Sequence, residues 1–138
     1  MKIRAILVLL SISLLLPLSA CGGAKATHIY FSISAEAVPA SADQEALPAI
    51  AHNISLPIAA LPKMDVMHAI EFAVQSLGYE CVREGKYSEI LASVAGRPNG
   101  DSGHWQIEGT EANGNPLSLS TDSTLERVHT LSITYIAQ

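Results

Sequence analysis

A histidine and a glutamate spaced by three residues form the local pair best suited to hold a metal ion. His68 and Glu71 fall at positions i and i+3 of a predicted helix, a spacing that can place two ligands on one face. A zinc site needs three or four ligands with supporting partners, so this pair supplies at most half of one. Further possible ligands have no local spacing that adds them to the pair: His52, His104, His129 and Cys81. We therefore predict a solvated helix face, and no metal or other cofactor.

A short polar string could instead carry nucleophilic chemistry. Residues 100–104 read Gly-Asp-Ser-Gly-His. They resemble the Gly-Asp-Ser-Gly-Gly segment around the nucleophile of chymotrypsin-like serine proteases, with His104 replacing the last glycine. That chemistry needs a histidine base beside Ser102 and a buried aspartate to orient it. The resemblance also implies a pair of β-barrels, for which this chain is too short. Because Gly, Asp and Ser are equally typical of turns, we predict a turn after Pro98 and no catalytic residue.

The N-terminal segment carries the most specific signal. Two basic residues, Lys2 and Arg4, precede an apolar run from Ala5 to Leu16, which is the layout of a secretory signal peptide. This run of 12 residues is short for a transmembrane helix, which needs about 20. The sequence Leu-Ser-Ala-Cys follows and ends at Cys21. Over residues 1–23, the chain resembles the bacterial lipoprotein precursors, whose lipobox ends in an obligatory cysteine.

The resemblance implies that Cys21 is a lipidation site. It implies diacylglycerol transfer to the Cys21 thiol, cleavage before this residue and acylation of the new amino group. Two or more acyl chains hold a protein stably on a membrane. Gly22 is not the aspartate that typically retains such proteins in the inner membrane, so we expect the outer membrane, facing the periplasm. Ordinary secretion is the alternative. We predict a signal peptide (1–20), a lipidated tether (21–26) and a single domain (27–138).

The mature chain is small and acidic. Cleavage leaves 118 residues, enough for one domain. Loss of Lys2 and Arg4 leaves six basic residues against 13 acidic ones, a formal net charge of −7. This balance argues against nucleic acid as a partner, because Lys and Arg dominate phosphate binding. Cys81 is left without an intramolecular partner. It could be buried and inert, form an intermolecular bridge or be reactive, and we predict the first because free cysteines are usually buried.

One amphipathic helix is predicted at about 63–77. Its apolar residues recur with the i, i+3, i+4, i+7 spacing of a buried stripe, and Met67 and Phe72 widen the apolar face. Gly78 suits the C-terminal cap. The members of the stripe are Val66, Ala69, Ile70, Ala73, Val74 and Leu77.

The rest of the domain alternates between apolar and polar residues with the period of β-strands. An Ala/Pro-rich segment, 35–48, is predicted to be irregular, and Asn113-Gly114 marks a hairpin. We predict an α+β domain with one main helix on a mainly antiparallel sheet of about five to seven strands. The candidate strands are residues 27–34, 53–58, 79–83, 89–95, 104–110, 117–121 and 127–136.

Three functions compete for this chain. We favour a non-enzymatic, lipid-anchored envelope protein that binds a protein partner or has an accessory role. An envelope inhibitor or immunity-type protein is the second hypothesis, and it predicts a protruding polar loop, for which 96–103 is the candidate. A small enzyme acting on the cell wall is the third, with Asp101, His104 and Glu108 as candidate groups. Among the aromatic residues, alternation predicts that Trp105 and Tyr135 pack in the core; Tyr30 and Tyr87 are expected to be exposed.

Overall fold

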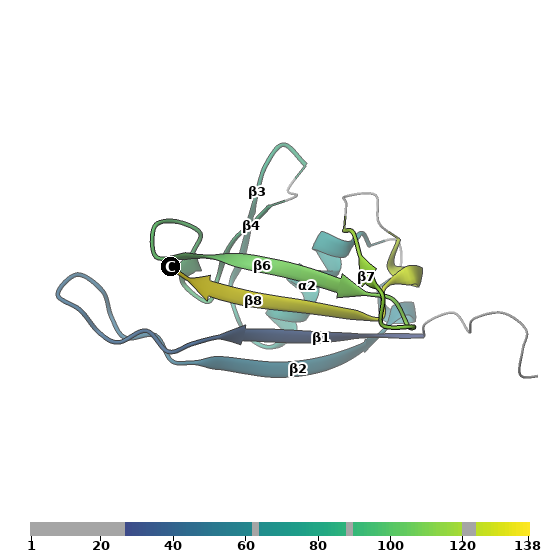
Figure 1. The fold of residues 1–138 in the computed structure, drawn as a ribbon, viewed down its shortest axis with the longest axis horizontal. Coiled ribbons are helices and arrows are strands. Elements are labelled where there is room, and N and C mark those ends of the chain that lie inside the picture. The colour runs from purple at the N-terminus through teal and green to yellow at the C-terminus, as the bar shows by residue number, and fades with distance from the viewer. Residues whose placement is uncertain (1–26, 62–63, 88–89, 120–123) are drawn as a thin grey trace, which may run out of the picture.

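The computed structural model describes residues 27–61, 64–87, 90–119 and 124–138 (Figure 1). The predicted signal peptide and Cys21 therefore lie outside the described residues. Within the described ranges, no helix is long and apolar enough to cross a membrane. The elements in chain order are β1 (His28–Ala35), β2 (Ile50–Pro57), the 3-10 helix η2 (Ile58–Ala60), α2 (Val66–Ser76), β3 (Cys81–Glu84), β4 (Ile90–Val94), β5 (Arg97–Pro98), β6 (Gly103–Thr110), β7 (Pro116–Leu117), η3 (Leu125–Arg127) and β8 (Thr130–Ala137).

The larger sheet joins both ends of the described chain. Its five strands lie in the order β2-β1-β8-β6-β7. The pair β1–β8 runs parallel and places Tyr30 opposite Thr130 and Ser34 opposite Thr134, whereas the other pairs are antiparallel. A parallel pair requires a long crossover connection, and here α2 and the smaller sheet occupy it. The strand at 27–34, which the sequence predicted, is therefore a central strand of the domain.

Alternation along the strands separates a buried face of this sheet from an open one. Ile29, Phe31 and Ile33 of β1 are at most 1% exposed, and Leu131 and Ile133 of β8 are fully buried. They face the side covered by α2 (Figure 1). The opposite face is polar, and its neighbouring hydroxyls bond across the strands: Ser32 to Ser132 at 3.2 Å and Ser34 to Thr134 at 3.3 Å.

Helix α2 begins later than the sequence predicted. Asp65 is its N-cap, and a carboxylate oxygen of Asp65 accepts a hydrogen bond of 2.8 Å from the His68 backbone N–H. Gly78 follows the helix with φ +84°, which agrees with its predicted place at the C-terminal end. The predicted stripe is buried except for the half-buried Leu77, but Phe72 is 38% exposed and does not widen the apolar face.

The smaller sheet has three strands in the order β3-β4-β5. Its register shifts between Val82 and Arg83, which alters the alternation along β4. Strict alternation would place Ile90 on the same side as Ala92 and Val94, but these two are buried together with Leu91, whereas Ile90 is 48% exposed. A β-bulge of this kind cannot be recognised from alternation alone, because it inserts one residue out of phase.

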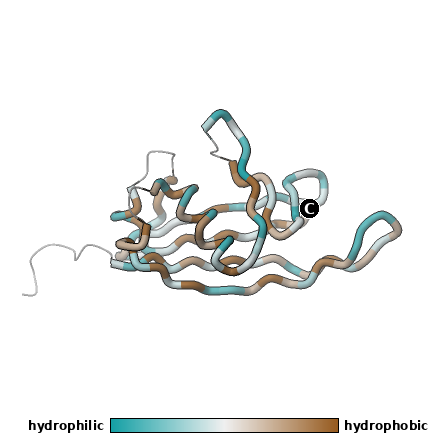
Figure 2. Tube along the Cα trace, turned by 180° about the vertical axis from the view of Figure 1, so that it is seen from behind, coloured by the Kyte–Doolittle hydropathy of each residue, from teal (hydrophilic) through white to brown (hydrophobic). Residues whose placement is uncertain are grey.

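Residues 36–49 form a projecting hairpin, which we call the arm. The sequence predicted irregular structure here, but backbone hydrogen bonds join Val38 to Leu47 and Ser41 to Gln44. The arm extends beyond the ends of β1 and β2 (Figure 1), and Figure 2 shows a hydrophilic stretch near its tip. The turn falls at residues 42–43. The arm is thus an extension of the β1–β2 hairpin.

The predicted α+β class with one substantial helix is confirmed. The strands, however, form two sheets of five and three strands instead of one sheet. The Asn-Gly hairpin is confirmed: Gly114 has φ +83°, and the Glu111 N–H donates to the carbonyl of Asn115 at 2.9 Å. Strand β7 is limited to Pro116–Leu117, and residues 120–121 of the predicted strand lie outside the described residues.

Candidate binding groove

A groove of about 820 Å³ lies at the base of the arm. The arm forms one wall and the end of β8, from Thr134 to Ala137, contributes another; Arg97 and Pro98 of β5 also line it. Most of the lining side chains are apolar, and the charged ones are Glu36 and Arg97. The volume lies within the range of roughly 300–1,000 Å³ that is typical of small-molecule sites.

Arg97 is the buried charged residue of this groove. The side chain is 2% exposed, although the sequence placed it in a polar loop at 96–103, so that prediction is corrected. The Nη2 group donates hydrogen bonds to the backbone carbonyls of Glu36, at 3.3 Å, and of Pro48. Among the described residues, the buried Nε–H has no hydrogen-bond partner. Arg97 therefore connects the two ends of the arm to the domain but keeps an unsatisfied donor.

Asn99 and Trp105 hold the backbone around Arg97 in place. The Trp105 indole N–H donates to the Arg97 carbonyl at 2.7 Å. The Asn99 side chain accepts from the Trp105 backbone N–H at 2.7 Å and donates to the Leu91 carbonyl at 2.8 Å. Neither Arg97 nor Asn99 could be recognised as a structural residue from the sequence, because a segment rich in Gly, Pro and Asn is typical of exposed turns.

The string 100–104 has the geometry of a turn. Gly100 and Gly103 exchange backbone hydrogen bonds of 2.9 and 3.2 Å, with residues 101–102 between them. Ser102 and His104 are exposed. Among the described residues, no hydrogen bond joins the Ser102 hydroxyl to a histidine. The structure therefore does not assemble the triad that the protease-like string would require.

The possible metal ligands are distributed over several places. His68 pairs with Asp65, with 2.9 Å between Nδ1 and the carboxylate, whereas Glu71 pairs with Arg83 at 2.8 Å. His52 lies 2.7 Å from the Tyr79 hydroxyl. Within the part of the chain that the structure describes, no three side chains of metal-binding type come together.

Cys81 is half-buried, although the sequence predicted full burial. Burial and the neighbouring Glu71 carboxylate raise the pKa of the Cys81 thiol to about 11, with Arg83 opposing the shift. Since the thiolate is the nucleophile, this thiol is poorly reactive near neutral pH.

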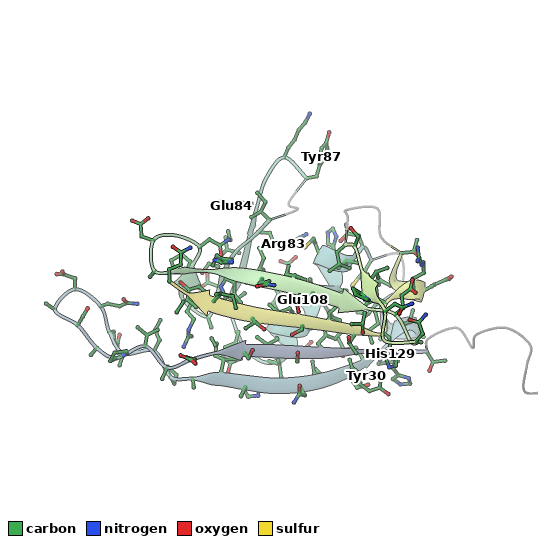
Figure 3. All side chains as sticks on the ribbon, in the orientation of Figure 1. Tyr30, Arg83, Glu84, Tyr87, Glu108 and His129 are labelled. Atoms are coloured by element: carbon green, nitrogen blue, oxygen red, sulfur yellow. The ribbon has the colours of Figure 1, made fainter. Side chains whose placement is uncertain are left out.

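The exposed aromatic residues lie away from the groove. Tyr30 is 49% exposed and packs edge-on against the His129 ring, with 5.2 Å between the ring centroids. Tyr87, 71% exposed, lies at the tip of the β3–β4 hairpin and points away from the sheets (Figure 3). Trp105 is 6% exposed, and the half-buried Tyr135 hydroxyl donates to the Pro98 carbonyl at 3.1 Å. The predicted exposure of Tyr30 and Tyr87 and the predicted burial of Trp105 are confirmed, whereas Tyr135 is only partly buried against the core.

Comparisons with known proteins do not assign the chain to a family. The sequence matches no protein-family model, and no curated protein resembles it significantly.

Proposed function

We propose that the mature protein is a non-enzymatic binding protein of the bacterial envelope, anchored to the membrane by lipid on Cys21. The lipobox sequence supports the anchor. The arm is the observation that carries the binding role, because a hairpin that projects from the sheet can reach a second protein without rearrangement of the core.

The arm is better suited to a specific protein contact than to indiscriminate edge-to-edge pairing with strands of other molecules. Pro39 and Pro48 lack a backbone N–H, and prolines on an edge oppose edge-to-edge aggregation. The tip carries two exposed carboxylates, Asp43 and Glu45. An acidic tip favours a basic patch on the partner, since complementary charge steers encounter and selects partners.

A projecting hairpin with a polar tip also favours the inhibitor or immunity-type hypothesis over a cell-wall enzyme. This hypothesis predicted a protruding polar loop at residues 96–103, but that segment contains the buried Arg97. The arm is the segment that projects (Figure 1). An inhibitor would use the arm tip to block a second protein. The accessory role and the inhibitor role both require that the arm binds a partner protein, so this binding is tested first.

The test is cross-linking of the tagged full chain in intact cells, followed by mass spectrometry. A photo-reactive residue replaces Ala42 at the arm tip, and the same residue at exposed Ala112 is the matched control. The proposal predicts one protein cross-linked at position 42 and absent at position 112. It also predicts a weaker cross-link when Asp43 and Glu45 are changed to Asn and Gln. Equal products from both positions would overturn the binding role of the arm.

A further inference from the structure

We propose that the groove at the base of the arm binds a small amphipathic carboxylic acid, with its carboxylate at Arg97 and its apolar body along the arm and the end of β8. This site differs from the contact proposed for the tip carboxylates Asp43 and Glu45, although Gln44 between them also lines the groove.

The Arg97 guanidinium is a buried cation that has no anionic partner in the part of the chain that the structure describes. An arginine side chain stays protonated in proteins, and burial of a charge is costly unless the charge is paired. The two groups that accept from it are neutral backbone carbonyls. No carboxylate forms an ion pair with Arg97 among the described residues, and the buried Nε–H lacks any acceptor. A carboxylate in the groove would provide the missing negative charge beside the guanidinium.

The remaining lining favours an apolar body on that acid. Val38, Leu47 and Ile136 line the groove together with several alanines. Of the polar side chains in the lining, Ser34 bonds to Thr134 and the Tyr135 hydroxyl bonds to Pro98. Gln44 and Ser102 also line the groove. The groove therefore combines one charged donor, Arg97, with much apolar contact, which suits an amphipathic acid better than a ligand with many hydroxyls.

Glu36 is the other charged residue of the groove, and it sets a limit on the ligand. Its backbone carbonyl accepts from Arg97, and the residue is exposed and lines the groove. A second carboxylate on the ligand would approach this like charge. The site thus fits a monocarboxylate better than a dicarboxylate, and Glu36→Gln is expected to tighten binding.

The test uses the full chain in lipid nanodiscs and saturation-transfer NMR, with empty nanodiscs as the blank. The probes are hexanoate, hexan-1-ol and hexylammonium, which share one apolar chain and differ in the head group. The expected result is saturable hexanoate binding, with the alcohol and the amine weaker by about tenfold or more, the loss typical of a hydrogen bond to a charged group. Equal binding of the acid and the alcohol, or no binding of hexanoate, would overturn the proposal.

Two variants locate the site. Arg97→Gln should weaken hexanoate binding by about tenfold, with Arg127→Gln as the control because Arg127 lies outside the groove and is 68% exposed. If circular dichroism shows that Arg97→Gln does not fold, Ala137→Trp tests the site instead. Ala137 is exposed and lines the groove, so the indole would fill it. Ala112→Trp is its control. If Ala137→Trp binds hexanoate as tightly as the wild type does, the proposal that the acid binds in this groove is wrong. The purified chain contains no partner protein, so this result is independent of the cross-linking test.

Discussion

At the scale of single residues, capping and burial determine the properties of the side chains. The Asp65 carboxylate is partly desolvated, which raises its pKa, but hydrogen bonds from the backbone and side chain of His68 and the charges of His68 and Arg83 together hold its pKa below the ordinary value. A lowered pKa in the folded state means that the ionised cap stabilises the fold.

Asp65→Ala is expected to lower the free energy of unfolding by about 1 kcal/mol at pH 7, the usual cost of losing an N-cap. The contribution of the carboxylate is complete above the unfolded-state pKa of about 4 and disappears as the pH falls through the lower folded-state pKa. The difference between wild type and Asp65→Ala should therefore shrink below about pH 4 in urea titrations. Asp65→Asn, which keeps a side-chain oxygen, is the control and should lose less at pH 7.

The raised pKa of Cys81 predicts slow alkylation of the folded protein. At pH 8, a thiol of pKa about 11 holds roughly two orders of magnitude less thiolate than an ordinary cysteine. Iodoacetamide should label Cys81 correspondingly slowly in a Cys21→Ala background, and at the ordinary rate in urea, as measured by mass spectrometry. Equal rates in the folded and unfolded protein would contradict this account of the thiol.

At the scale of elements, the close approach of β6 to β8 depends on a glycine. Gly103 has φ +151°, and a Cβ at this position would meet the Ile136 carbonyl oxygen at 2.5 Å. We expect Gly103→Ala to cost about 1–3 kcal/mol of stability, as overpacking does, measured by chemical denaturation. Gly100→Ala is the matched control in the same turn, because its Cβ would have no neighbour within 4 Å. Similar stabilities for the two variants would show that the strand end relaxes freely.

The elements that the sequence predicts well are those whose pattern of apolar and polar residues lies within one short segment. Alternation identified β1, and the apolar stripe identified α2, because each pattern reports one buried face. The β4 bulge was missed, because the shift of register depends on pairing with β3. The arm was missed for another reason: its residues, rich in Ala and Pro, have weak β-propensity. These residues form a hairpin nonetheless, because they continue the β1–β2 hairpin beyond the ends of the two strands.

At the scale of the whole molecule, the features that the sequence concealed are contacts between distant segments. Ser32 bonds to Ser132 across 100 residues, and local patterns cannot reveal such a parallel pairing. Arg97 is buried because carbonyls 49 and 61 residues away accept its hydrogen bonds. The candidate groove was therefore beyond sequence analysis, whereas the proposed lipid anchor depends on sequence alone.

The central claim is that the mature protein is held at a membrane by lipid on Cys21, and membrane flotation of cell lysates tests it most directly. Wild type and Cys81→Ala, the control for loss of a thiol, are expected to float with the membranes. Cys21→Ala should leave the floating fraction or keep its signal peptide, as intact mass will show. If processed Cys21→Ala floats as wild type does, the lipid anchor is refuted.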